Sequence, residues 1–254
     1  NGRSGKVPRA AFFLYHFKPI FFRLHQLPTA WIRPISPKEP ILNVPATILF
    51  AVVLLGFAHL FVSAAASRDF ADWIVWDGAF IPARFYELPH SYFYTLATCS
   101  LLHGSWGHLI NNCVWLIAFG SPIAAALGGF RFTLFWITCA VAAALIHFAA
   151  APTSTIPMIG ASGAVSGMMG AVARAGFRLP VEASTGQSLN RLPPMGSVLL
   201  SRSVQAFILV YLLINIGIGF GEAAAPGLSG IAWQAHIGGL IAGFFLFSIF
   251  VRCR

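Results

Sequence analysis

Long stretches without a single charged residue constrain this chain more than any other feature. No Lys, Arg, Asp or Glu occurs in five segments: 41–67, 88–130, 132–173, 203–221 and 223–251. Several of them exceed the roughly 20 apolar residues that a helix needs to cross the hydrocarbon core of a bilayer. Of the 254 residues, 57% are hydrophobic and 9% are charged. Within that core, irregular backbone is tolerated only where it is buried inside protein or lines a water-filled cavity. We therefore expect these segments to form membrane helices.

The lengths of the apolar segments predict six transmembrane helices. Two charge-free segments, 88–130 and 132–173, are too long for one helix each. The expected spans are 42–66, 106–128, 131–150, 162–177, 203–220 and 231–251. The sequence therefore predicts an all-α polytopic membrane protein, in which residues 41–254 form a six-helix bundle.

The basic residues gather on one side of these spans. Fourteen of the sixteen Lys and Arg residues lie in segment 1–40, in the two loops on the same side, or at the end of the chain. The positive-inside rule then places both termini in the cytoplasm. Segment 1–40 is basic and aromatic, and we expect either an interfacial segment on the anionic inner leaflet or a disordered tail. The net charge of +9 does not indicate nucleic-acid binding, because no basic patch is interleaved with a soluble fold.

The fourth span is too short to cross the membrane, and it begins at a serine. From Ser162 to Phe177 the helix would be about 24 Å long, against a hydrocarbon core of roughly 30 Å. Because Arg174 and Arg178 fix its cytoplasmic end, its outer end should be recessed. Segment 151–161 must then descend as non-helical chain, which is tolerated only inside protein or along a wet cavity. We expect Ser162 at the floor of such a cavity.

The sixth span carries a histidine at a similar depth. His236, Gly239 and Gly243 share one face of that helix, and glycines let another helix approach closely. The fourth span has a glycine ridge of its own: Gly163, Gly167 and Gly170. If the two ridges meet, His236 is carried to Ser162.

The second span adds two more polar residues, His108 and Asn112, one helical turn apart. A serine beside a histidine is a nucleophile with its general base. Donors beside them, with N–H groups at a helix N-terminus, would stabilise an oxyanion. Because the second span and the last four spans contain no carboxylate, the pattern predicts a Ser162–His236 dyad rather than a Ser-His-Asp triad.

Each of these motifs also has a purely structural interpretation. Small residues such as Gly-x-Ser-Gly pack membrane helices generally, a single intramembrane histidine is often structural, and Asn112 can bond across helices. His59 and His147 have no partner motif, and we interpret them as structural or pore-lining. The conjunction of three complementary motifs at one depth favours function, because ionisable groups inside a membrane are costly.

Taken together, the motifs resemble those of the rhomboid intramembrane serine proteases of the six-helix bacterial form. GASG at 160–163 resembles the Gly-x-Ser-Gly of that family. His108 and Asn112 resemble its His-x-x-x-Asn oxyanion pair, and AHIGGLIAG at 235–243 resembles its Ala-His-x-x-Gly-x-x-x-Gly. The resemblance covers residues 41–251.

The resemblance implies a nucleophile at Ser162, a general base at His236, and oxyanion donors from His108, Asn112 and the Ser162 N–H. It implies cleavage of single-span membrane proteins in or near the bilayer, without metal, ATP or another cofactor. A recessed polar active site in a bacterial inner membrane follows from the same resemblance. It leaves the natural substrate and the oligomeric state open.

The chain departs from the family pattern one turn after the nucleophile. Ser166 stands where many relatives have an aromatic ring that packs on the catalytic histidine, so the His236 ring should be held differently, by water or by Ser166. In the first outer loop, Tyr94-Thr95 replaces the common Trp-Arg pair. We also expect the outer segment 221–230, which is rich in Gly and Ala, to act as a movable cap over the site.

Two other functions are alternatives to proteolysis. A catalytically inactive relative that binds membrane clients would typically have lost the nucleophile or the histidine, and both are present. A small transporter would more readily show inverted repeats or an intramembrane carboxylate, and neither is visible in the sequence.

Activity is expected to survive EDTA, and a serine-directed fluorophosphonate is expected to label Ser162. The reason is that His108 and His236 have no Cys or carboxylate with which to complete a set of metal ligands. The measurements are substrate cleavage with and without chelator, and mass spectrometry of the labelled peptide. Activity that EDTA abolished and zinc restored would contradict this expectation.

Overall fold

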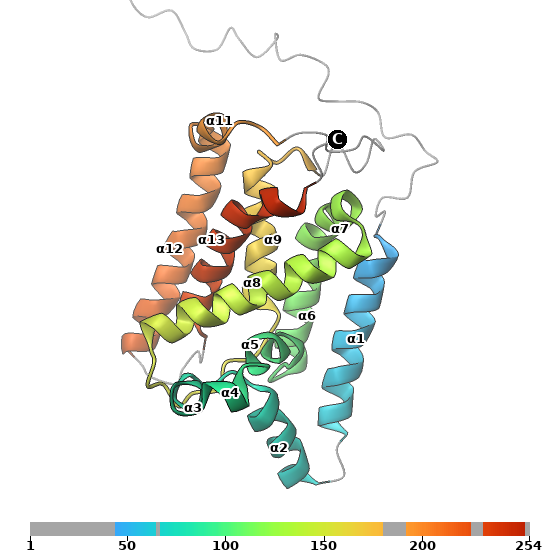
Figure 1. The fold of residues 1–254 in the computed structure, drawn as a ribbon, viewed down its shortest axis with the longest axis vertical. Coiled ribbons are helices and arrows are strands. Elements are labelled where there is room, and N and C mark those ends of the chain that lie inside the picture. The colour runs from blue at the N-terminus through green and yellow to red at the C-terminus, as the bar shows by residue number, and fades with distance from the viewer. Residues whose placement is uncertain (1–43, 65–66, 180–191, 225–230, 252–254) are drawn as a thin grey trace, which may run out of the picture. The chain divides into compact units, whose positions relative to one another are not determined.

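The computed structural model describes residues 44–64, 67–179, 192–224 and 231–251. Its elements are helices joined by turns and irregular segments (Figure 1). The expected interfacial segment 1–40 lies outside the described residues. So does most of the expected cap 221–230, of which only the first four residues belong to a described helix.

Within the described residues, five helical spans are long and apolar enough to cross a membrane. They are α1 (Ala46–Ser63), the second span at Trp106–Leu127, α8 (Gly129–Ala150), α12 (Arg202–Ala224) and α13 (Trp233–Phe250). The second span consists of α6 (Trp106–Trp115), a π-helical turn η5 (Leu116–Gly120) and α7 (Ser121–Leu127). All five agree with the expected bounds to within four residues.

The remaining long element, α9 (Ser162–Arg174), begins at the expected serine but ends three residues before Phe177. The N–H of Gly176 donates to the Ala173 carbonyl at 2.9 Å, and the N–H of Phe177 donates to the Val172 carbonyl at 3.0 Å. These are the two bonds of a Schellman motif, which needs a left-handed residue after the helix. Gly176 supplies this conformation with φ of +63°. The helix α9 therefore ends earlier than the apolar pattern of the sequence predicts.

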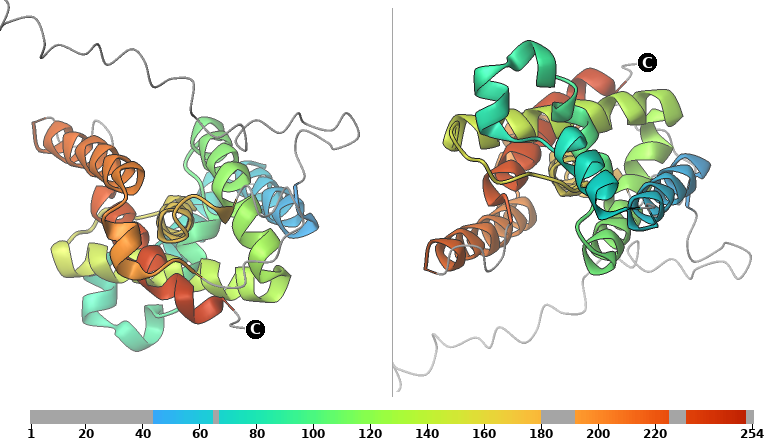
Figure 2. Two further views of the ribbon diagram at one scale, coloured as in Figure 1. Left: turned by 90° about the horizontal axis from the view of Figure 1, so that it is seen from above. Right: turned by 90° about the horizontal axis from the view of Figure 1, so that it is seen from below.

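With 13 residues, α9 is about 20 Å long and falls short of a hydrocarbon core of roughly 30 Å. Seen along the spans, α9 lies at the centre of the helices, whereas α1 and α12 lie at opposite edges (Figure 2). Every residue from Gly163 to Arg174 is buried. The short helix is therefore enclosed by protein rather than by lipid.

The two glycine ridges meet, as the sequence predicts. A Cβ on Gly239 would lie 2.0 Å from the Gly163 carbonyl oxygen, and one on Gly243 would lie 1.8 Å from the Gly167 carbonyl oxygen. A Cβ on Gly170 would collide with the backbone of α13 in the same way. Since backbone meets backbone along this line, α13 holds a fixed register on α9.

The segment between the first two spans folds into short helices, which lie together at one end of the spans (Figure 1). They are α2 (Arg68–Gly78), α3 (Pro82–Glu87), α4 (Pro89–Tyr92), α5 (Thr95–Thr98) and η4 (Cys99–Leu101). At the opposite end, α11 (Met195–Leu199) precedes α12. We call residues 67–105, which hold the short helices between the first two spans, the outer segment, after the side on which the basic residues of the sequence predict it. Within it, Arg84 donates to the Trp76 carbonyl and lies 4.0 Å from the centre of the Tyr92 ring.

The outer segment also provides hydrogen-bond partners for the backbone of the descending chain, residues 151–161, which is non-helical as expected. Phe80 and Met158 exchange backbone hydrogen bonds of 2.8 and 3.1 Å, and the N–H of Gly160 donates to the Cys99 carbonyl at 2.9 Å. Backbone polar groups at membrane depth need partners of this kind. The descending chain can therefore reach Ser162 with these backbone groups paired.

Gly243→Ala is expected to destabilise the fold, because its methyl group would overlap the backbone of α9, which no side-chain rotation can relieve. We expect a loss of at least about 1–3 kcal/mol, the usual cost of overpacking, measured by thermal unfolding in detergent. Gly56→Ala in α1 is the matched control, since a Cβ there meets nothing within 4 Å; its stability should stay equal or rise by up to ~1 kcal/mol. Equal unfolding midpoints for Gly243→Ala and the wild type would contradict the close helix contact.

Candidate active site

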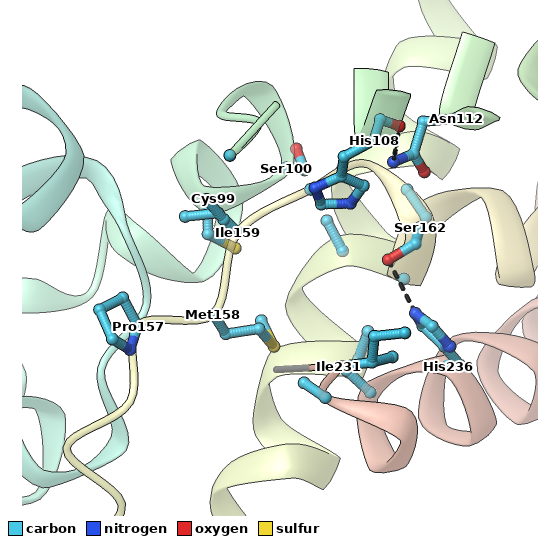
Figure 3. Close-up of a pocket in the computed structure, with 18 of the residues that line it drawn as sticks. Cys99, Ser100, His108, Asn112, Pro157, Met158, Ile159, Ser162, Ile231 and His236 are labelled. Carbon is cyan, nitrogen blue, oxygen red and sulfur yellow. Dashed lines mark hydrogen bonds between the residues drawn. The ribbon is translucent and has the colours of Figure 1, made fainter. Parts of the chain in front are cut away.

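A cavity of ≈ 640 Å³ opens above the N-terminus of α9. Its walls come from the end of the outer segment, the first turns of α6, the descending chain and the first turn of α13 (Figure 3). Polar side chains line it: Ser100, Ser105, His108, Asn111, Asn112, Ser162 and His236. A cavity of this size, with polar side chains set in a mainly apolar wall, has room for water and for part of a polypeptide.

Ser162 and His236 meet on one wall of this cavity. The Oγ of Ser162 lies 2.8 Å from Nε2 of His236, which is within hydrogen-bonding distance. Ser162 is the first residue of α9, and His236 lies in the first turn of α13. The glycine contact sets this distance, because Gly239, three residues after His236, rests on the carbonyl of Gly163.

Ser162 also lies at the N-terminus of α9. The first N–H groups of any helix have no intrahelical partner, and they carry the positive end of the helix dipole. Among the described residues, no side chain caps α9. The N–H groups of the first turn are therefore available to an anion that forms next to Ser162 Oγ.

His108 and Asn112 face Ser162 across the cavity (Figure 3). Ser105 begins α6 by accepting from the His108 N–H at 3.1 Å, which puts His108 in the first turn. The Asn112 amide donates to the His108 carbonyl at 3.0 Å, and its second N–H is left for another acceptor. Gly160, with φ of +117°, lies against the His108 ring, where a Cβ would come within 2.7 Å.

Of the two expected ways of holding the His236 ring, the one through Ser166 is wrong. Its hydroxyl donates to the Ser162 carbonyl at 2.6 Å, the bond to the preceding turn that a helical serine commonly makes. It also accepts from the Tyr211 hydroxyl at 2.6 Å. The second ring nitrogen of His236, Nδ1, instead lies 2.9 Å from Oδ1 of Asn215.

Three polar residues of this site were missed by the sequence analysis: His103, Tyr211 and Asn215. His103 is buried and accepts from the Ala161 N–H at 3.5 Å. Tyr211 and Asn215 lie one turn apart in a charge-free span, and their signal was polarity inside an apolar segment.

The other two intramembrane histidines lie away from Ser162. His59 donates from Nδ1 to the His103 carbonyl at 3.0 Å, which is a structural contact. His147 lines a second, smaller cavity.

The described part of the chain offers little for a metal ion to bind. No group of three or more His, Cys, Asp or Glu side chains is placed to hold one within it. Its three cysteines, Cys99, Cys113 and Cys139, are all free thiols. The chemistry available at the cavity is therefore that of a hydroxyl, imidazoles, amides and helix N–H groups.

A known family model covers the part of the chain that forms this cavity. The family model described as the rhomboid domain matches residues 90–253. Rhomboid protease GluP of Bacillus subtilis (strain 168) is 31% identical over 150 residues, which cover 59% of this chain and 24% of that protein. RHOMBOID-like protein 5 of Arabidopsis thaliana is 24% identical over 152 residues, which cover 59% of this chain and 42% of that protein. The matched part thus spans less than half the length of either relative.

Proposed function

This chain belongs to the rhomboid family and is an integral membrane protein, and we propose that it is an intramembrane serine endopeptidase. Ser162 is the nucleophile and His236 its general base. The observation that carries this proposal is the 2.8 Å contact between Ser162 Oγ and His236 Nε2, on the wall of a cavity within a bundle of apolar helices. A nucleophile within hydrogen-bonding distance of its base is the signature of covalent catalysis.

The reaction begins when Ser162 Oγ attacks the carbonyl carbon of a substrate peptide bond. As the new C–O bond forms, the hydroxyl proton moves to Nε2 of His236. Collapse of the tetrahedral intermediate expels the amine, which takes that proton from His236. An acyl-enzyme remains on Ser162. Water from the cavity then attacks the ester, with His236 again as the base, and the acid product leaves.

The negative charge of the tetrahedral intermediate lies between the N-terminus of α9 and the second span. The Ser162 N–H, the free amide N–H of Asn112 and the His108 ring are the donors we assign to it. Preorganised donors lower the barrier more than equivalent donors in solution, because they need no reorganisation during the reaction. This arrangement requires neither a metal nor a cofactor.

Single-span membrane proteins are the substrates we propose. The helix of such a substrate would arrive from the lipid, and it would have to unwind to expose one peptide bond to Ser162. We place α9 as a sixth span, recessed on the outer side, so that the cavity is wetted from outside. The basic loops then put both termini in the cytoplasm, as in a bacterial inner membrane. A catalytically inactive, client-binding relative is the alternative, and it would bind such substrates without cutting them.

Ser162→Ala and His236→Ala are each expected to abolish cleavage and to leave a folded protein, because a nucleophile and its base act as one unit. We expect a loss of at least about 10³-fold, since either change costs a serine protease up to ~10⁶-fold. Cleavage of a labelled single-span protein in proteoliposomes measures it. Ser91→Ala and His90→Ala, both exposed on α4, are matched controls. Substantial turnover by both site variants would rule out this dyad.

Asn112→Ala is expected to lower kcat and to change KM little, because its second amide N–H acts mainly on the transition state. The loss should be of order 10- to 10³-fold. Ile110→Ala, an exposed position on the same helix, should keep the wild-type kcat. A change confined to KM would make Asn112 a substrate-binding residue instead.

A further inference from the structure

The best-defined contact that the dyad mechanism leaves unused lies behind His236. Asn215 on α12 is buried, with 3% of its surface exposed. Its Oδ1 lies 2.9 Å from Nδ1 of His236, whose Nε2 faces Ser162 Oγ at 2.8 Å. Asn215, His236 and Ser162 therefore form one continuous line of hydrogen-bonding groups drawn from three helices.

The partners of Asn215 decide where the proton of His236 lies. The amide Nδ2 of Asn215 donates to the Tyr211 carbonyl at 2.9 Å, and a carbonyl can only accept. This fixes the orientation of the amide, so that Oδ1, which also only accepts, faces the ring. Nδ1 of His236 must then be the donor. Since a neutral imidazole carries one N–H, Nε2 keeps its lone pair and can accept the Ser162 proton.

We propose that Asn215 is the positioning residue of the catalytic histidine: it selects the Nδ1–H tautomer and completes a Ser162–His236–Asn215 triad. Its catalytic consequence rests on the proposed function, whereas the tautomer does not. When His236 accepts the second proton, the Asn215 oxygen remains bonded to Nδ1–H and stabilises the imidazolium. Asn215 touches neither substrate nor the reacting atoms, so it acts through His236 alone.

An amide at position 215 has a physical advantage over a carboxylate in a membrane span. An ionised carboxylate costs far more to bury in an apolar medium than an amide whose polar atoms are paired. Both polar atoms of the Asn215 side chain have partners. A neutral orienting group therefore suits a membrane span that carries no charged residue between Ser203 and Gly221.

A second bond from α12 keeps Asn215 in register with the site. Tyr211, one turn earlier, donates from its hydroxyl to Ser166 Oγ at 2.6 Å, and Ser166 donates to the Ser162 carbonyl at 2.6 Å. The small Ser166 leaves room for this ring. Through Asn215, α12 thus contacts the base directly. Through Tyr211 and Ser166 it is linked to the backbone carbonyl of the nucleophile.

The test combines spectroscopy with kinetics on the full chain in detergent or proteoliposomes. Histidine 15N NMR, with the His236 signal assigned from the spectrum of His236→Ala, reports which ring nitrogen carries the proton. The variants are Asn215→Leu, which keeps the volume but cannot accept, and Asn215→Asp, which can accept. Ile214→Ala, an exposed neighbour on α12, controls for changes to the helix itself.

The wild type should show the Nδ1–H tautomer, and Asn215→Leu should show a mixture or the other tautomer. Asn215→Leu should lower kcat about 10- to 10³-fold with little change in KM, less than the roughly 10⁴-fold effect of replacing a carboxylate orienter. Asn215→Asp should cut faster than Asn215→Leu, and Ile214→Ala should match the wild type.

An Nε2–H tautomer in the wild-type protein would overturn the proposal by itself. The proposal therefore remains testable even if Asn215→Leu does not fold. Cleavage by folded Asn215→Leu within twofold of the wild type would overturn it as well, as would Asn215→Asp cutting no faster than Asn215→Leu. A wild type that cut no substrate yet showed the Nδ1–H tautomer would refute the proposed function and leave the positioning by Asn215 standing.

Discussion

The contact of backbone with backbone between α9 and α13 is the interaction on which the rest of the structure depends. Gly239 and Gly243 rest on the carbonyls of Gly163 and Gly167, so the two helices approach more closely than any side chain permits. Such a contact has only one register, because shifting either helix by a residue would drive a side chain into backbone. That register brings a serine and a histidine that are 74 residues apart in sequence to 2.8 Å.

A short, central helix creates a second requirement, which the outer segment meets. Because α9 begins below the end of the neighbouring spans, the chain before it must run unwound through the protein. Its backbone groups are paired by Phe80 and Cys99 of the outer segment, and its inner side faces the cavity. The outer segment therefore supplies hydrogen-bond partners that neither lipid nor an empty cavity could provide.

Apolar length and glycine spacing predicted the five long spans, the start of α9 at Ser162 and the meeting of the glycine ridges. They did so because membrane thickness and close helix packing act on local sequence alone. The end of α9 depends on Gly176 adopting a left-handed conformation, which an apolar pattern does not reveal. The partner of His236 was missed for a different reason. Asn215 lies on another helix, and its direction depends on how α12 packs, so the sequence offered only a polar residue in an apolar span.

The orienting amide lies on one of the least enclosed helices of the bundle. Only 11% of the membrane-spanning window of α12 is buried, against 44% for α13, and α12 lies at an edge of the bundle (Figure 2). An outward shift of α12 would take the amide away from His236 and the Tyr211 hydroxyl away from Ser166 together. The proposed general base would then lose its orienting partner, although Ser162 itself had not moved. Because so little of α12 is buried within the protein, the alignment of the proposed base would depend on the lipid around that helix.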